Sequence, residues 1–259
     1  MRNPPVTTRD HPTPLVAVAH GSTDPRSAAA VHGLVSRMRT RRPELDIRCA
    51  YLDHVSPDPF HTISDLAASG AGEVVVAPVL LTSAYHSKVD LPQVLERVQH
   101  TYPWLRLRYA DTLGPHALLL DAVERRLIRS GVSASPDTAV VLAAAGSSDP
   151  AANQVIRDLA TALEARAGWH SVTAAYASAT EPGPAEAVTA AYERGARRVV
   201  TATYLLAPGF FSDRIERQAR SAGAWTTTPT LGDCPELAEL ALLRYDEARS
   251  LAGRIGAPQ

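Results

Sequence analysis

Short apolar runs alternate along the first half of the chain with segments whose apolar residues recur at helical spacing. The run at 73–81 is apolar on both faces, which is typical of a buried strand in a parallel sheet. Residues 25–42 place Leu34 and Met38 at helical spacing, and Pro25 stands at the first helical position. Such strands separated by helices indicate right-handed βαβ crossovers and a mainly parallel sheet. The predicted strands are 14–20, 44–52, 73–81 and 105–111, and the predicted helices are 25–42, 57–70, 89–102 and 116–131.

The second half of the chain repeats the first. The segment AVAHGSTDP at 17–25 corresponds to LAAAGSSDP at 142–150, which is an offset of 125 residues. The same offset aligns VVVAPVLLTSAYHS at 74–87 with VVTATYLLAPGFFS at 199–212. One constant offset over so long a stretch indicates a tandem duplication of a single domain.

The later part of the repeat is shorter in the second copy. The tripeptide TLG recurs at 112–114 and 230–232, which is an offset of 118 residues. We therefore expect an α/β fold of two tandem, similar, doubly wound domains with mainly parallel sheets. The expected domains are 1–132 and 133–259, and the linker between them is 133–137.

Composition excludes several classes of protein. The 259 residues are 45% hydrophobic and 20% charged, as in ordinary globular proteins. A net charge of −1 gives no basic surplus for nucleic acid, and no apolar run is long enough to span a membrane. Cys49 and Cys234 have no metal-finger spacing, and the first residues hold no apolar signal-peptide core. We expect a soluble cytoplasmic protein with neither a nucleic-acid nor a membrane partner.

Ionisable residues follow three successive strands of the first domain. His20 follows the first predicted strand, Asp53 the second and His86 the third. Ligands of open parallel sheets bind beyond the carboxyl ends of the strands, so we expect these three residues to meet at one edge. His54 has the opposite strand phase and is expected to point away. Each histidine alone is compatible with a structural role, Asp53 with a turn or cap, and Asp90 with a helix N-terminus.

The duplication provides an internal comparison for these residues. The second copy has lost the ionisable residues but keeps the loop-forming ones. The replaced pairs are His20 and Ala145, Asp53 and Ser178, and His86 and Phe211; the retained pairs are Gly21 and Gly146, Ser22 and Ser147, and Asp24 and Asp149. This selective loss favours a functional site in the first domain and a degenerate second copy.

The residue types at this edge suit two kinds of chemistry. Two neutral imidazoles and a carboxylate are suitable ligands for Fe²⁺, Co²⁺ or Ni²⁺, and they leave coordination positions open. Imidazole also accepts protons near neutral pH. We predict His20 and His86 as catalytic and metal-binding residues, and Asp53 as a third, weaker metal ligand.

Two motifs resemble a known family. HGSTDPRS at 20–27 and PVLLTSAYHSKVDLP at 78–92 resemble the CbiX/SirB group of class II tetrapyrrole chelatases, the sirohydrochlorin cobaltochelatases and ferrochelatases. The resemblance implies two similar domains facing a central cleft, and ATP-independent insertion of a divalent metal into sirohydrochlorin in siroheme or cobalamin biosynthesis. It identifies His20 and His86 with the family's two active-site histidines, whereas Asp53 falls where many members carry glutamate.

The resemblance also implies the partners. Sirohydrochlorin and a divalent metal ion (Fe²⁺, Co²⁺ or Ni²⁺) are the substrates, and no permanently bound cofactor is expected. The long form is similar to a fused dimer, so we expect a monomer, and the lack of a histidine-rich tail favours iron. Cationic side chains are expected to bind the carboxylates of sirohydrochlorin, and apolar side chains its ring. The aromatic residues are equally compatible with a place in the hydrophobic core. The predicted substrate-binding residues are Ser22, Arg26, Tyr85, Lys88, Phe210, Phe211 and Arg214.

Two other functions compete with this one. A phosphohistidine enzyme of the histidine phosphatase type carries arginine before the histidine, but here Ala19 precedes His20. A non-enzymatic metal or tetrapyrrole carrier stays open, because binding and insertion use the same ligands. Turnover separates the two, since a carrier yields at most one equivalent of metallated product.

Overall fold

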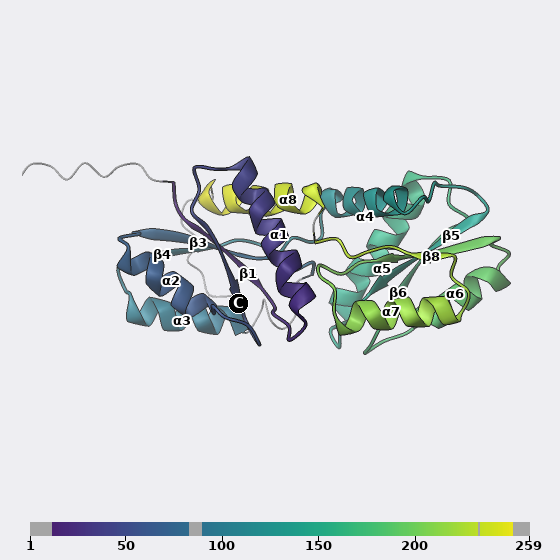
Figure 1. Cartoon of the computed structure of the whole chain (residues 1–259), viewed down its shortest axis with the longest axis horizontal. Helices are drawn as coiled ribbons and strands as arrows, with labels where there is room; N and C mark the ends of the chain where they lie inside the picture. The colour runs from purple at the N-terminus through teal and green to yellow at the C-terminus, as the bar shows by residue number, and fades with distance from the viewer. Residues whose placement is uncertain (1–11, 83–89, 233, 251–259) are drawn as a thin grey trace, which may run out of the picture.

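The computed structural model describes residues 12–82, 90–232 and 234–250, and within them the strands form two four-stranded parallel sheets (Figure 1). The first sheet has the order β2-β1-β3-β4 and the second β6-β5-β7-β8. The same strand order in both halves confirms the predicted duplication and fold class. The strands are β1 (Leu15–Ala19), β2 (Ile47–Tyr51), β3 (Glu73–Pro78), β4 (Arg106–Tyr109), β5 (Thr138–Ala144), β6 (Ser171–Tyr176), β7 (Arg198–Thr203) and β8 (Thr226–Thr227).

Helices cover both faces of each sheet. Each predicted helix of the first half is present and is one or two residues shorter than expected at one or both ends. Asp24 and Asp149 each begin a helix in the same way, because the carboxylate accepts a backbone N–H two residues on. The helices are α1 (Pro25–Arg41), α2 (Pro59–Ala68), α3 (Leu91–Thr101), α4 (Ala117–Arg129), α5 (Pro150–Arg166), α6 (Pro184–Glu193), α7 (Phe210–Ser221) and α8 (Pro235–Ser250).

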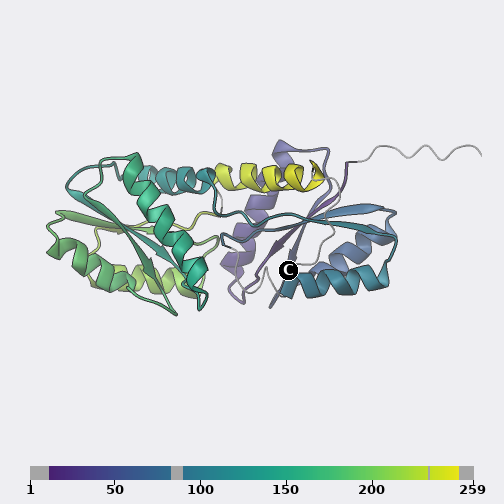
Figure 2. The ribbon, with the colours of Figure 1, turned by 180° about the vertical axis from the view of Figure 1, so that it is seen from behind.

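The two halves exchange their last helices. α8 packs on β3, β4 and α1 of the first half, whereas α4 packs on β7 and α5 of the second. α4 and α8 also contact each other and lie end to end along one side of the molecule (Figures 1 and 2). Arg125 of α4 and Glu236 of α8 form an ion pair of 2.6 Å there. The boundary predicted between residues 132 and 133 thus divides the sequence repeat, while the packing crosses it.

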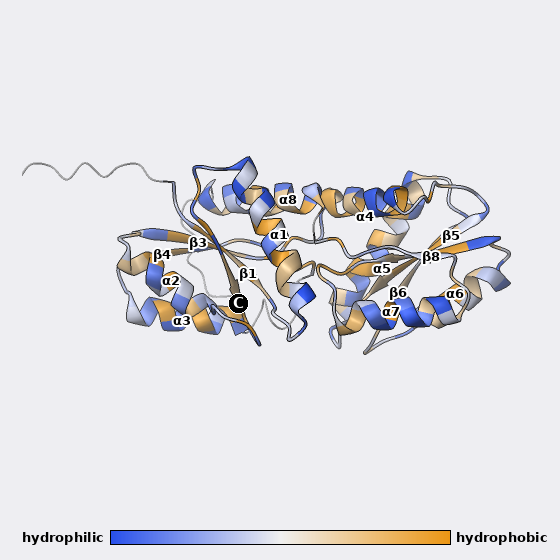
Figure 3. Cartoon of the chain, in the orientation of Figure 1, coloured by the Kyte–Doolittle hydropathy of each residue, from blue (hydrophilic) through white to orange (hydrophobic). Residues whose placement is uncertain are grey.

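This exchange joins the cores of the two halves. One apolar cluster includes Leu15 and Val75 of the first sheet together with Val140 and Val200 of the second. Smaller clusters fill the opposite faces, under α2 and α3 in one half and under α6 and α7 in the other. Hydrophobic residues concentrate in the central strands, whereas the outer face of α7 is hydrophilic (Figure 3). Within the described ranges, no helix combines the length and the apolar character that crossing a membrane requires.

Candidate active site between the two domains

A cavity of about 730 Å³ lies between the carboxyl ends of the two sheets. Its wall comes from the loops after β1, β3, β5 and β7, from one residue each after β2 and β6, and from the N-terminal turns of α1, α5 and α7. Equivalent loops of both copies face it, and lining residues include His20, Ser22, Thr82, Ala145, Ser147 and Phe210. The position is the one that parallel sheets favour for ligands.

His20 is held at this edge by a close approach of two loops. The Asp53 N–H donates to the His20 carbonyl over 2.9 Å. Gly21 has φ +95°, and a Cβ there would lie 1.9 Å from the Asp53 carbonyl oxygen. Only glycine fits a positive φ with so close a backbone contact, which explains why Gly21 and its counterpart Gly146 persist in both copies.

The ring of His20 has a favoured tautomer when neutral. Its Nδ1 lies 2.9 Å from the Gly21 carbonyl oxygen, which can only accept a hydrogen bond. This contact favours the tautomer with the proton on Nδ1, in which Nε2 holds a lone pair of the kind that metal ions and protons bind. A backbone carbonyl is one of the usual partners of the second ring nitrogen in metal-binding histidines.

Asp53 and His54 lie differently from the strand phase. Asp53 Oδ1 accepts the His54 N–H over 2.8 Å, and its Oδ2 lies 3.3 Å from His54 Nε2. His54 has φ +61° and lines the cavity, so the expectation that it points away is wrong. The side chain of Asp53 is 62% exposed and is directed at His54. Within the described ranges, no three His, Cys, Asp or Glu residues form a group suited to a metal ion.

The predicted residues Tyr85, His86 and Lys88 lie outside the described residues, and their roles stay predictions. The chain reaches that segment from the cavity, because residues 79–82 all line it. Asp90, on the far side of the segment, directly precedes α3 and makes no side-chain capping hydrogen bond with it.

The wall from the second copy is neutral at the position of His20. Ala145 lines the cavity there, followed by Ser147. The side chain of Asn153 clamps this loop, since its Oδ1 accepts the Ser147 N–H over 3.0 Å and its Nδ2 donates to the Ser147 carbonyl over 2.7 Å. Tyr204, which stands at the position of Val79, is a cavity residue that the site motifs do not indicate. The sequence gives it no distinct signal, because Thr201 and Thr203 carry hydroxyls in the same run.

Phe210 and Phe211 begin α7 and line the cavity. They are 68% and 38% exposed and pack edge to face, with centroids 5.4 Å apart. Their interpretation as core residues is therefore wrong. Ser22 also lines the cavity, and its hydroxyl accepts the Asp24 N–H over 3.1 Å. Arg214 is half-buried on α7, outside the described lining of the cavity.

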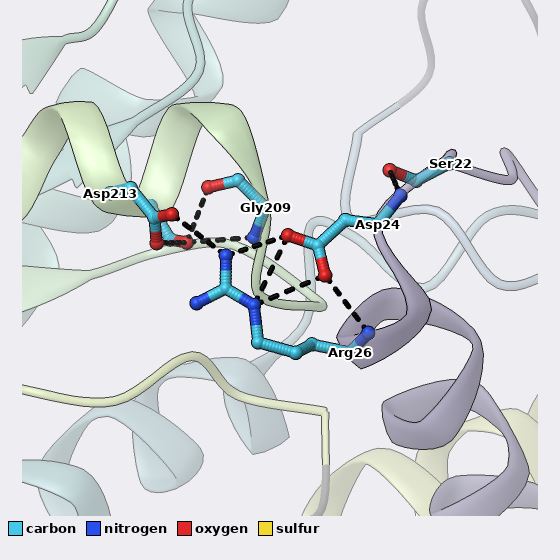
Figure 4. Close-up of polar contacts among 6 residues, drawn as sticks. Ser22, Asp24, Arg26, Gly209 and Asp213 are labelled. Atoms are coloured by element: carbon cyan, nitrogen blue, oxygen red, sulfur yellow. Dashed lines mark hydrogen bonds and ion pairs between the residues drawn. The ribbon is translucent and has the colours of Figure 1, made fainter.

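Arg26 joins the two halves beside the cavity (Figure 4). Its Nη2 lies 2.6 Å from Asp24 Oδ2 and 2.7 Å from Asp213 Oδ2 of α7. These hydrogen bonds raise the pKa of Arg26 and lower the pKa values of both carboxyls. Two protein carboxylates thus already bind the guanidinium predicted to bind substrate, and substrate binding by Arg26 stays a prediction.

We expect the Arg26–Asp213 pair to contribute a small, salt-dependent coupling between the halves. Arg26→Gln, Asp213→Asn and the double variant form a cycle that isolates the pair. The coupling, measured by thermal unfolding, should be present at low ionic strength and absent at about 1 M salt, where the Debye length is about 3 Å. Additive effects of the two substitutions at low salt would contradict a stabilising contact.

Comparison with known proteins agrees with the motifs. The CbiX family model matches residues 14–130 and again 139–248. A sirohydrochlorin cobaltochelatase of Priestia megaterium is 28% identical over 210 residues, which span 80% of this chain and 68% of that protein. A sirohydrochlorin ferrochelatase of the same organism is 24% identical over 209 residues, which span 81% and 79%.

Solved structures share the fold. SirB from Bacillus subtilis with Fe³⁺ superposes with a TM-score of 0.81 at 24% identity, over 95% of this chain and 99% of that one. The sirohydrochlorin chelatase SirB from Bacillus subtilis subspecies spizizenii, in complex with cobalt, gives a TM-score of 0.80 at 20% identity over the same shares. Since the family model covers both halves, the chain belongs to the CbiX family.

Proposed function

We propose that this protein is a sirohydrochlorin chelatase that inserts Fe²⁺ or Co²⁺ into sirohydrochlorin without ATP. The observation that carries the proposal is His20, whose ring is fixed through Nδ1 on the Gly21 carbonyl at a cavity between the two sheets. The related proteins named for sirohydrochlorin metallation, with iron or with cobalt, support the same substrate.

The reaction makes three demands on the protein. The metal ion, which is a substrate, must shed water; two pyrrole N–H protons must leave; and the macrocycle must be held in place. In the proposal, Nε2 of His20 and the ring of His86 first coordinate the ion. When the ion passes to the macrocycle, each freed lone pair accepts one of the two pyrrole protons. Imidazole suits both roles near neutral pH.

Neighbouring residues have supporting roles in the proposal. Asp53 assists through its contact with His54, which itself lines the cavity. The rings of Phe210 and Phe211 pack against the macrocycle, since both are exposed at the cavity. One chain provides both walls of the cavity, so we propose that the active unit is a monomer. We also propose that it acts in the cytoplasm.

Anaerobic absorbance of sirohydrochlorin with Fe²⁺ and, separately, Co²⁺ tests the proposal. Wild-type protein should form many equivalents of metallated product per chain and exceed an enzyme-free blank. Faster insertion of Fe²⁺ than of Co²⁺ would agree with the preference for iron expected from the sequence. Formation of at most one equivalent per chain would indicate a carrier, and a rate equal to the blank would contradict the proposed reaction.

A further inference from the structure

Tyr204 is a cavity-lining residue that carries a buried hydroxyl. The residue directly follows β7, lines the cavity and is only 2% exposed. Its backbone N–H donates to the Ala143 carbonyl over 2.7 Å, which fixes its position at the strand end. The phenolic oxygen is buried and has no hydrogen-bond partner in the described part of the chain.

The other large buried phenols show that this arrangement is unusual. The Tyr176 hydroxyl donates to the Asn153 carbonyl, and the Tyr245 hydroxyl donates to the Thr13 carbonyl, each over 2.8 Å. The Tyr51 hydroxyl also lacks a conventional partner, but it interacts with the Cys49 thiol away from the cavity lining. Tyr204 alone among these four combines an unpaired hydroxyl with a place at the cavity.

An unpaired buried hydroxyl disfavours folding, so the fold alone gives no reason for it. In the first copy the equivalent residue is Val79, which also lines the cavity and has no polar atom. An apolar side chain therefore serves this place in the fold. The tyrosine adds an aromatic ring, which packs in the apolar core, and one O–H group, which no core contact satisfies.

The chemical state of the group defines what it can bind. Burial raises the pKa of the Tyr204 phenol far above neutrality, so the hydroxyl keeps its proton. It is therefore a neutral donor and neither a phenolate ligand for the metal nor a base. Its partner in a complex must be a hydrogen-bond acceptor.

We infer that Tyr204 binds the tetrapyrrole, donating its hydrogen bond to a carboxylate oxygen or an unprotonated ring nitrogen of sirohydrochlorin. The inference rests on the proposed function and extends it, because it assigns a substrate-binding residue to the second copy. The second copy has lost the histidines, but in this assignment it still recognises the substrate.

Tyr204→Phe removes only the hydroxyl. Metal-free sirohydrochlorin, titrated by absorbance, should bind the variant about threefold to tenfold more weakly than wild type, because one hydrogen bond is lost. The Tm of the protein without substrate should stay unchanged or rise, since the buried group had no partner. In turnover, KM should rise while kcat changes little, because the hydroxyl takes no part in proton transfer.

Tyr245→Phe is the matched control. It removes a paired phenolic hydroxyl outside the described cavity lining, so it should lower Tm and leave sirohydrochlorin affinity unchanged. Cobalt-sirohydrochlorin as the titrant separates the two acceptors, because its ring nitrogens are occupied. A defect that persists with this product indicates a carboxylate, and one that disappears indicates a ring nitrogen.

Two results would overturn the inference. Equal sirohydrochlorin affinities of wild type and Tyr204→Phe would overturn it and leave the proposed function standing. A Tm loss in Tyr204→Phe as large as that of Tyr245→Phe would assign the hydroxyl to the fold instead. Failure of wild type to bind sirohydrochlorin at all would overturn this inference and the proposed function together.

Discussion

His20→Ala is expected to lower the rate of metal insertion by about two to four orders of magnitude while the fold stays intact. Positioned general bases contribute effects of this size, and His20 would also bind the incoming ion. The side chain is half-buried at the cavity, and its removal leaves the backbone bond between Asp53 and the His20 carbonyl in place. The measurement is initial turnover with Fe²⁺ and Co²⁺, together with Tm.

His100→Ala is the matched control for this variant. His100 is exposed near the end of α3, outside the described lining of the cavity, so its loss should leave turnover unchanged. Added imidazole should restore part of the activity of His20→Ala, since it can enter the space that the side chain leaves. Wild-type turnover in His20→Ala would assign the chemistry to another residue.

The fold was predictable because its signals are local. The apolar run at 73–81, the helical spacing of 25–42 and the constant repeat offset each involve residues close in sequence or plainly duplicated. The two TLG segments also occupy equivalent places in the structure, although their offset in sequence is 118 and not 125. Added Cβ atoms at Gly114 and Gly232 would lie 2.1 Å and 2.4 Å from the carbonyl oxygens of the equivalent residues Leu81 and Leu206.

The exchange of α4 and α8 was not predictable in the same way. Both helices bury apolar faces, and those faces suit either of two nearly identical sheets. Apolar periodicity states that a helix covers a sheet, but not which copy of the sheet it covers. The choice depends on the path of the chain between the halves, which involves contacts far apart in sequence.

The site shows the same division between local and distant information. Strand order placed His20 and Asp53 at one edge, and the structure confirms that their backbones meet there. The φ of +61° at His54 departs from the strand geometry on which the phase argument depends, and this residue lines the cavity. Tyr204 escapes notice in the sequence because an unpaired hydroxyl is a property of its surroundings in three dimensions.

Gly21→Ala is expected to destabilise the protein by about 3 kcal/mol, which combines strain at positive φ with overpacking. An added Cβ would lie 1.9 Å from the Asp53 carbonyl oxygen, a backbone atom that cannot move without separating the loops after β1 and β2. Denaturant unfolding measures the loss of free energy, and in thermal unfolding the Tm should fall by about 6–12 °C.

Gly33→Ala is the control, because the same change is made where it should do no harm. Gly33 lies inside α1, and an added Cβ there meets nothing within 4 Å. Alanine in a helix interior should stabilise the protein by about 0.5–1 kcal/mol. A loss of stability in Gly33→Ala similar to that in Gly21→Ala would show that the close approach to Asp53 is not the cause.

The second copy extends this test to the duplication itself. Gly146 has φ +86°, and an added Cβ would lie 1.9 Å from the Ser178 carbonyl oxygen, as Gly21 does against Asp53. Gly146→Ala should therefore cost about as much stability as Gly21→Ala. The two glycines therefore have the same structural role. Only Gly21 directly follows a histidine, because Ala145 stands in the second copy where the first has His20. If Gly146→Ala were harmless, the glycine of the first copy would owe its presence to the chemistry of His20 and not to the fold.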